Sequence, residues 1–129
     1  MGVRLTIPGT TPSVNHMYKD KWIKGRKYRV LTDEAQAWAD EAVLLAKSWR
    51  NRTRWSTPEG KVVVNLWFFF PDNRKRDTHN GQKLLLDCLE AAGIYENDRY
   101  ALPRIMDWEI DRANPRIELE IFKLQEVAS

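Results

Sequence analysis

Hydrophobic and polar residues alternate with recognisable periods along most of this chain, and these periods predict its secondary structure. Residues 3–7 alternate and predict a strand that ends at Pro8-Gly9. Residues 62–70 form the most hydrophobic run, rich in β-branched and aromatic side chains, which is typical of a central strand. Residues 104–111 and 116–123 predict two more strands, joined by a turn at Asn114-Pro115. Residues 19–29 predict either a loop or a hairpin, leading into a short strand at 28–31.

Two amphipathic helices are predicted between these strands. Thr32 is a suitable N-cap for the first, in which apolar residues recur at three- and four-residue spacing over about four turns: Ala35, Trp38, Ala42, Leu45 and Trp49. A polar loop is expected over residues 51–60. The second helix should run from about Thr78 to Ala92 and stop at Gly93. Its predicted buried face comprises Leu84, Leu85, Cys88, Leu89 and Ala92. The aromatic residues expected in the core are Trp38, Trp49 and Trp67.

The predicted order is β-β-α-β-α-β-β. This order favours an α+β fold with a mixed sheet and two main helices over a doubly wound parallel sheet. The length of 129 residues fits one domain over residues 1–129, with a frayed tail at 124–129.

Composition excludes several classes of protein. No apolar run reaches the roughly 20 residues of a membrane span, and residues 1–8 lack the apolar region of a signal peptide. The single cysteine, Cys88, cannot form an internal disulfide, so we expect a reducing, cytoplasmic setting. The glycine-rich nucleotide motifs are absent, so no small-molecule cofactor is expected.

The net charge of +3 hides an uneven distribution along the chain. Residues 1–76 hold 15 Lys and Arg against 7 Asp and Glu, whereas residues 77–129 hold 6 against 11. This division indicates a face that binds a polyanion beside an acidic site. The alternative is that folding intermixes the charges on an ordinary surface.

The second predicted helix also carries a polar stripe. At about 100° per residue, Asn80, Lys83 and Asp87 cluster opposite the apolar face, while Asp77 and His79 lie at the helix start. Carboxylates that hold a divalent metal, beside cations that hold phosphate, are the ingredients of a metal-dependent nuclease. The alternative is structural: Asp77 favours a helix N-terminus, and Lys83 and Asp87 form an i,i+4 pair.

Three motifs occur in a fixed order. The segment Thr11-Pro12-Ser13-Val14-Asn15-His16-Met17-Tyr18 resembles a PPSxNxxY opening, and residues 32–42 are similar to a T-x-E-A helix start. The third motif is Arg76-Asp77-x-x-Asn80-x-x-Lys83-x-x-x-Asp87-x-Leu89, followed by Ala92-Gly93-Ile94 and Asn97-Asp98. Together they resemble the RusA family of Holliday junction resolvases over most of the chain.

This resemblance implies an endonuclease that acts in DNA recombination and repair. It would resolve four-way (Holliday) DNA junctions by paired symmetric nicks, as a homodimer that needs Mg²⁺. The implied catalytic residues are Asp77, Lys83 and Asp98, with Asp87 in a supporting role. Family association further implies a bacterial or phage-encoded protein in the host cytoplasm.

The chain departs from the family pattern at two positions. His79 replaces an aspartate of the third motif, and Asn97 replaces the first member of the late aspartate pair. With Asp77 and Asp98, His79 completes a candidate metal set and is also a candidate catalytic residue; the alternative is that His79 bonds a helix-start carbonyl or contacts phosphate. Asn80 and Asn97 are candidate supporting residues. Because imidazole suits Mn²⁺ better than Mg²⁺, we expect Mn²⁺ to support activity at least as well. The alternatives are a non-catalytic branched-DNA-binding protein with a degenerate metal site, and a nuclease with another target.

Basic residues near these motifs are candidates for DNA binding. Counterion release from the phosphates would make such binding weaken steeply with salt. Trp22 or Tyr28 is a candidate for stacking on an opened base, the alternative being ordinary packing. The candidate cations are Lys19, Lys21, Lys24, Arg26, Lys27, Arg29, Arg74, Lys75 and Arg76, with a third cluster at Arg50, Arg52 and Arg54.

Overall fold

The computed structural model describes residues 3–12, 14–74, 78–79 and 81–124, without the side chains of Val14 and Asn15. In chain order its elements are β1 (Leu5–Pro8), α1 (Val14–Met17), β2 (Tyr18–Ile23), β3 (Arg26–Leu31), α2 (Asp33–Thr53), β4 (Val62–Phe70), α3 (Gln82–Ala91), the 3-10 helix η1 (Asp98–Tyr100), β5 (Ala101–Ile110) and β6 (Arg116–Lys123).

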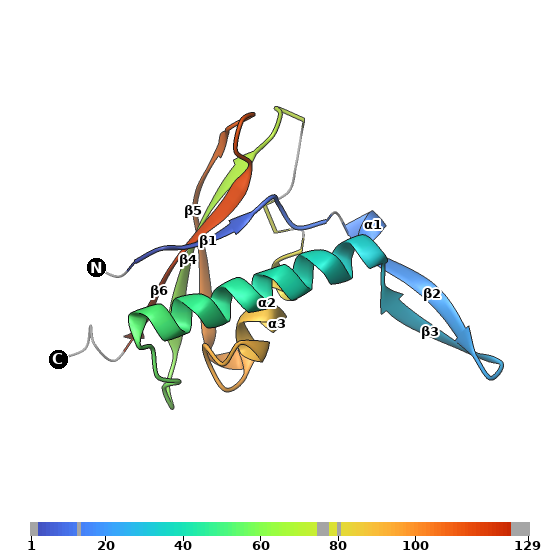
Figure 1. The fold of residues 1–129 in the computed structure, drawn as a ribbon, viewed down its shortest axis with the longest axis horizontal. Coiled ribbons are helices and arrows are strands. Elements are labelled where there is room, and N and C mark those ends of the chain that lie inside the picture. The colour runs from blue at the N-terminus through green and yellow to red at the C-terminus, as the bar shows by residue number, and fades with distance from the viewer. Residues whose placement is uncertain (1–2, 13, 75–77, 80, 125–129) are drawn as a thin grey trace.

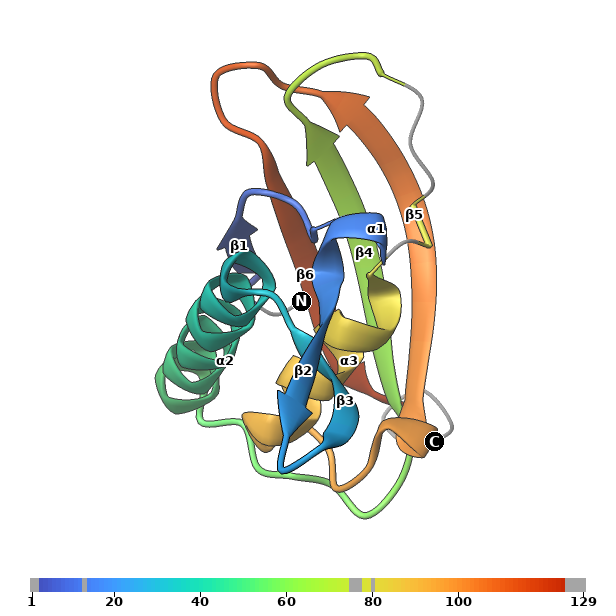
Figure 2. The same ribbon diagram turned by 90° about the vertical axis from the view of Figure 1, so that its right-hand side faces the viewer.

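Four strands form one mixed sheet in the order β1-β6-β4-β5. β4 pairs with β5 in parallel and with β6 antiparallel. Parallel neighbours need a crossover, and α3 with η1 provides it beside the sheet (Figures 1 and 2). This arrangement confirms the α+β class, the mixed sheet and the two main helices. The predicted order lacked one strand of the β2–β3 hairpin and the short elements α1 and η1.

The helix boundaries differ from their predictions for local reasons. Thr32 caps α2 as expected, since its hydroxyl accepts a hydrogen bond from the backbone N–H of Ala35 at 3.3 Å. The helix continues to Thr53, into the predicted loop. α3 begins at Gln82 rather than Thr78, because Gly81 holds a φ of 77° that ends helical geometry. A side chain on Gly81 would lie 2.5 Å from Thr11, so this start requires glycine.

The core lies between the sheet and the two long helices. The predicted apolar face of α3 is confirmed, since all five of its residues are buried. Burial raises the pKa of the Cys88 thiol to about 11, so this cysteine is a neutral packing residue at physiological pH. Its thiol also contacts the carbonyl of Ala39 in α2 at 3.7 Å.

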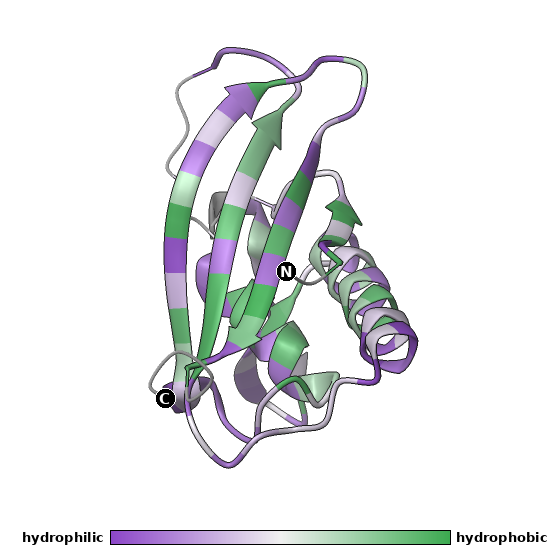
Figure 3. Cartoon of the chain, turned by 90° about the vertical axis from the view of Figure 1, so that its left-hand side faces the viewer, coloured by the Kyte–Doolittle hydropathy of each residue, from purple (hydrophilic) through white to green (hydrophobic). Residues whose placement is uncertain are grey.

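The prediction that Trp67 lies in the core was wrong. Trp49 is buried in the core, and Trp38 is half-buried and packs against the core. Alternate residues of β4 point to opposite sides of the sheet, and the core takes the set that contains Leu66 and Phe68. Trp67 therefore faces the other side, where the guanidinium of Arg4 lies 3.8 Å from its ring centroid. Figure 3 shows β4 mostly hydrophobic between two strands that alternate.

The β2–β3 hairpin projects from the body beyond the first turn of α2 (Figure 1). Every residue of the hairpin strands is exposed except the half-buried Val30 and Leu31. Thr32 fixes its base to α1, donating through its backbone N–H to Met17 and through its hydroxyl to His16, both at 2.8 Å.

The C-terminal tail is only partly described. Leu124, the first residue of the tail predicted to be frayed, donates its backbone N–H to the carbonyl of Lys61 at 3.1 Å. Residues 125–129 lie outside the described part of the chain. Among the described helices, none is both long and apolar enough to cross a membrane.

Candidate active site

The polar stripe of α3 is present on the described part of the helix. The ammonium of Lys83 lies 2.9 Å from a carboxylate oxygen of Asp87, one helical turn along. Both side chains are at least half exposed, at 69% and 50%. Since exposed i,i+4 pairs contribute little to stability, this contact alone would fit the structural alternative.

Tertiary structure adds Asp98 to this pair. Asp98 opens η1, 15 positions after Lys83, and its carboxylate also contacts the Lys83 ammonium. One cation is therefore shared by two carboxylates from different elements. We call Lys83, Asp87 and Asp98 the charged cluster.

Two further contacts hold Asp98 in place. A carboxylate oxygen of Glu90 accepts the backbone N–H of Asp98 at 2.7 Å. The side-chain oxygen of Asn97 accepts the backbone N–H of Arg99 at 2.9 Å and so caps η1. Asn97 thus has a structural role in the turn that presents Asp98.

The contacts of the charged cluster shift the pKa values of its members in opposite directions. The hydrogen bond from Lys83, opposed in part by burial, lowers the pKa of Asp98 below its usual value. Hydrogen bonds to Asp98 first and Asp87 second raise the pKa of Lys83 above its usual value. Both groups are therefore ionised throughout the neutral range.

The other predicted members of the site fall into two groups. Asp77 and Asn80 lie outside the described residues. His79 is described: its side chain is exposed, and its backbone carbonyl accepts the N–H of Gln82 at 3.2 Å, just before α3. Within the described residues, no three His, Cys, Asp or Glu side chains gather as a metal site would require. The predicted ligand set of Asp77, His79 and Asp98 therefore remains a prediction.

Sequence reasoning missed Glu90. It lies three residues after Asp87 and seven after Lys83, spacings that return to the same side of a helix. This spacing could have indicated that Glu90 shares a side of the helix with Lys83 and Asp87. It could not indicate that Glu90 accepts a hydrogen bond from a backbone N–H in η1.

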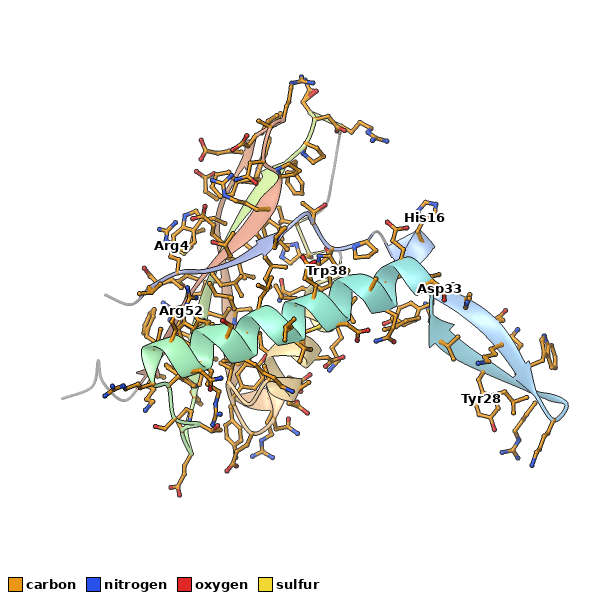
Figure 4. All side chains as sticks on the ribbon, in the orientation of Figure 1. Arg4, His16, Tyr28, Asp33, Trp38 and Arg52 are labelled. Atoms are coloured by element: carbon orange, nitrogen blue, oxygen red, sulfur yellow. The ribbon has the colours of Figure 1, made fainter. Side chains whose placement is uncertain are left out.

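The predicted DNA-binding cations separate into distinct surfaces. Six of them lie on the β2–β3 hairpin, while Lys75 and Arg76 lie outside the described residues. Arg74 is exposed and pairs with Asp72 at 3.2 Å. Arg52 lies near the far end of α2 from the hairpin (Figure 4), and Arg50 is half-buried beside Thr57.

A small mixed-sheet domain with a carboxylate–lysine cluster and a basic arm has the chemistry of a protein that acts on nucleic acid. Comparison with protein families agrees: a family model described as endodeoxyribonuclease RusA matches residues 8–122 of the 129-residue chain. The chain therefore belongs to the RusA family, whose members are nucleases that act on junction DNA. A search of curated proteins found no match.

Glu90 gives a prediction about the position of Asp98. In Glu90→Ala, the backbone N–H of Asp98 loses its acceptor, so the carboxylate should lose its fixed position. We expect the rate of DNA cleavage to fall about tenfold, the order of loss that follows when a residue that orients a group of the site is removed. Glu90→Gln keeps an acceptor oxygen, so its cleavage rate should fall less than that of Glu90→Ala. Glu96→Ala, which removes an exposed carboxylate from the segment between α3 and η1, is the control. Equal rates for Glu90→Ala and the native chain would contradict this role.

Proposed function

We propose that this protein is a metal-dependent endonuclease that resolves four-way DNA junctions by paired symmetric nicks. The observation that carries the proposal is the charged cluster, which α3 and η1 assemble at motif positions in a chain of the RusA family. Solvent-accessible ionised groups on two rigid elements suit a site that must admit a phosphodiester.

The family implies a divalent metal, and two of the described carboxylates supply the kind of oxygen donor that such an ion prefers. The carboxylates of Asp87 and Asp98 converge on a single cation, the Lys83 ammonium, and carboxylate oxygens are the ligands that Mg²⁺ prefers. We propose that Asp98 holds the metal together with Asp77 and His79, and that Asp87 supports it. When bound, such an ion neutralises charge on the phosphate and lowers the pKa of the attacking water.

In this proposal Asp98, Lys83 and the hairpin have separate roles. Asp98 remains ionised at neutral pH, so it can bind a cation without first losing a proton. Lys83 remains protonated and can move its hydrogen bond from Asp98 to a phosphate oxygen, where it would stabilise negative charge in the transition state. We also propose that one face of the basic β2–β3 hairpin holds the DNA.

Two symmetric nicks require two active sites, so we propose a homodimer with a two-fold axis. Support comes from β5, an edge strand of the sheet that exposes large apolar side chains: Met106 at 51%, Trp108 at 57% and Ile110 at 39%. An exposed apolar edge of this kind favours association with a second copy. Sedimentation equilibrium should therefore give twice the chain mass.

The direct test is cleavage of a labelled synthetic four-way junction in Mg²⁺, in Mn²⁺ or in EDTA. We expect paired symmetric nicks that need a metal, proceed at least as fast in Mn²⁺, and disappear in Asp77→Asn. The same assay on His79→Ala tests that residue as a ligand. A linear duplex of matched sequence is the control substrate. Tight junction binding without cleavage in any metal would contradict the proposal and favour a non-catalytic junction-binding protein.

A further inference from the structure

The β2–β3 hairpin has two chemically different faces. Its strands pair antiparallel from Tyr18 with Leu31 to Ile23 with Arg26. Lys24 and Gly25 close the turn with φ values of 50° and 76°, as a type I′ turn requires. Because cross-strand partners point to the same side, each face takes alternate pairs. One face, here called the basic face, carries Lys19, Lys21, Ile23, Arg26, Tyr28 and Val30; the opposite face carries Tyr18, Asp20, Trp22, Lys27, Arg29 and Leu31.

The cations of the opposite face are already engaged within the hairpin. Lys27 lies 3.6 Å from a carboxylate oxygen of Asp20. The guanidinium of Arg29 lies over the ring of Tyr18, 4.3 Å from its centroid. Asp20 also places a negative charge on this face, which would repel a phosphate.

The basic face has three cations and no acidic residue of the hairpin. Lys19 approaches Asp33, at the start of α2, to within 3.4 Å. Within the described residues, the structure records no ion pair for Lys21 or Arg26. Tyr28 is 43% exposed on the same face, and its side chain stands clear of the body (Figure 4).

The shape of the hairpin suits a duplex. A two-stranded ribbon is narrow enough to enter the major groove of B-DNA. Each strand has six residues and so extends about 20 Å, with same-face residues about 7 Å apart. The hydrogen bonds of Thr32 to α1 tie the base of this arm to the body.

We propose that the basic face of the hairpin binds a duplex arm of the DNA substrate through its phosphates, while the opposite face does not. Tyr28, rather than Trp22, is then the aromatic residue that touches the DNA. The hairpin projects beyond the start of α2, away from the sheet and α3 (Figure 1), so we propose that it contacts an arm rather than the crossover. The identity of the substrate as a junction rests on the proposed function; the choice of face does not.

The test compares two double variants that remove equal charge from one ribbon. Lys21→Gln/Arg26→Gln alters the basic face, and Lys27→Gln/Arg29→Gln alters the opposite face. Binding to a four-way junction and to a linear duplex is measured by fluorescence anisotropy in EDTA, which prevents metal-dependent cleavage, between 50 and 200 mM salt. Circular dichroism checks that both variants fold.

We expect the basic-face variant to bind both DNAs about tenfold more weakly, and the opposite-face variant to bind within about twofold of the native chain. The slope of log affinity against log salt should flatten by roughly 2 for the basic-face variant only, since about 0.9 is lost per phosphate contact. The ratio of junction to duplex affinity should not change, because the arm is duplex in both.

If the two variants lost the same amount of DNA affinity, the proposal that only the basic face binds DNA would be wrong. A loss confined to the junction would overturn the assignment to a duplex arm. These failures are distinct from failure of the proposed function. A native chain that cleaves junctions while the basic-face variant binds normally refutes only the present inference; a native chain that never cleaves, with the predicted loss of duplex binding, refutes only the proposed function.

Discussion

Replacement of Asp98 with asparagine should reduce junction cleavage by about 10²-fold or more, a loss typical of removing one charge-stabilising group from an active site. Asparagine has the same shape and keeps the backbone N–H that Glu90 accepts, so η1 should stay intact. What disappears is one of the two carboxylates that share the Lys83 ammonium. Rates from single-turnover cleavage at saturating protein would measure the effect.

The pKa of Asp98 sets the pH range of this prediction. Because Lys83 lowers it in the folded state, the contribution of Asp98 to stability is complete above the unfolded-state pKa and is lost as pH falls through the folded-state pKa. The carboxylate is thus ionised in any neutral assay. We therefore expect the difference between the native chain and Asp98→Asn to stay constant across the neutral range.

Asp107→Asn is the matched control. It makes the same change at an exposed aspartate of β5, whose carboxylate accepts only the N–H of the next residue among the described contacts. Cleavage by Asp107→Asn should equal that of the native chain. If Asp98→Asn also cleaved at the native rate, Asp98 would have no part in catalysis, and the charged cluster would be a surface ion pair.

Replacement of Lys83 with methionine should reduce cleavage by about 10²–10³-fold while junction binding and thermal stability change little. Methionine keeps the aliphatic length but removes the ammonium that faces both carboxylates. Since the Lys83 side chain is 69% exposed, the fold does not depend on its burial.

Metal affinity separates a catalytic role for Lys83 from a role in holding the site together. The ammonium occupies one carboxylate oxygen of Asp98, so its removal frees that oxygen for a cation. The concentration of Mg²⁺ or Mn²⁺ that gives half-maximal cleavage should therefore stay the same or fall in Lys83→Met. A rise in the metal requirement, with full activity restored at high metal, would show instead that Lys83 only organises the site.

Lys47→Met provides the control for lost charge. Lys47 is an exposed lysine on α2, so its replacement removes one positive charge without touching the charged cluster. Lys83→Arg tests the geometry of the donor, because it keeps the positive charge but replaces a compact ammonium group with a planar guanidinium group. We expect native rates from Lys47→Met and an intermediate rate from Lys83→Arg. If Lys47→Met and Lys83→Met lost the same amount of cleavage activity, the loss would be explained by the change in net charge alone.

The elements that local pattern predicted well are those in which one face is clearly buried. The apolar period of α3 gave its buried side correctly, and the alternation of residues 116–123 gave the bounds of β6. Trp67 shows the limit of this reasoning. Hydrophobicity alone does not say which side of a central strand meets the helices, and here the other side carries a tryptophan covered by Arg4.

The same division applies to the candidate site. Sequence by itself determined the Lys83–Asp87 pair and the N-cap at Thr32, because both depend on residues within one turn of a helix. Only the tertiary structure decided that Asp98 and Glu90 join the pair, and that the basic segment 19–29 stands out as a two-faced arm. These contacts depend on how the β4–α3–β5 crossover folds back on itself and on where the hairpin is fixed to α1. No local period encodes those distances, since they arise from the packing of elements far apart in the chain.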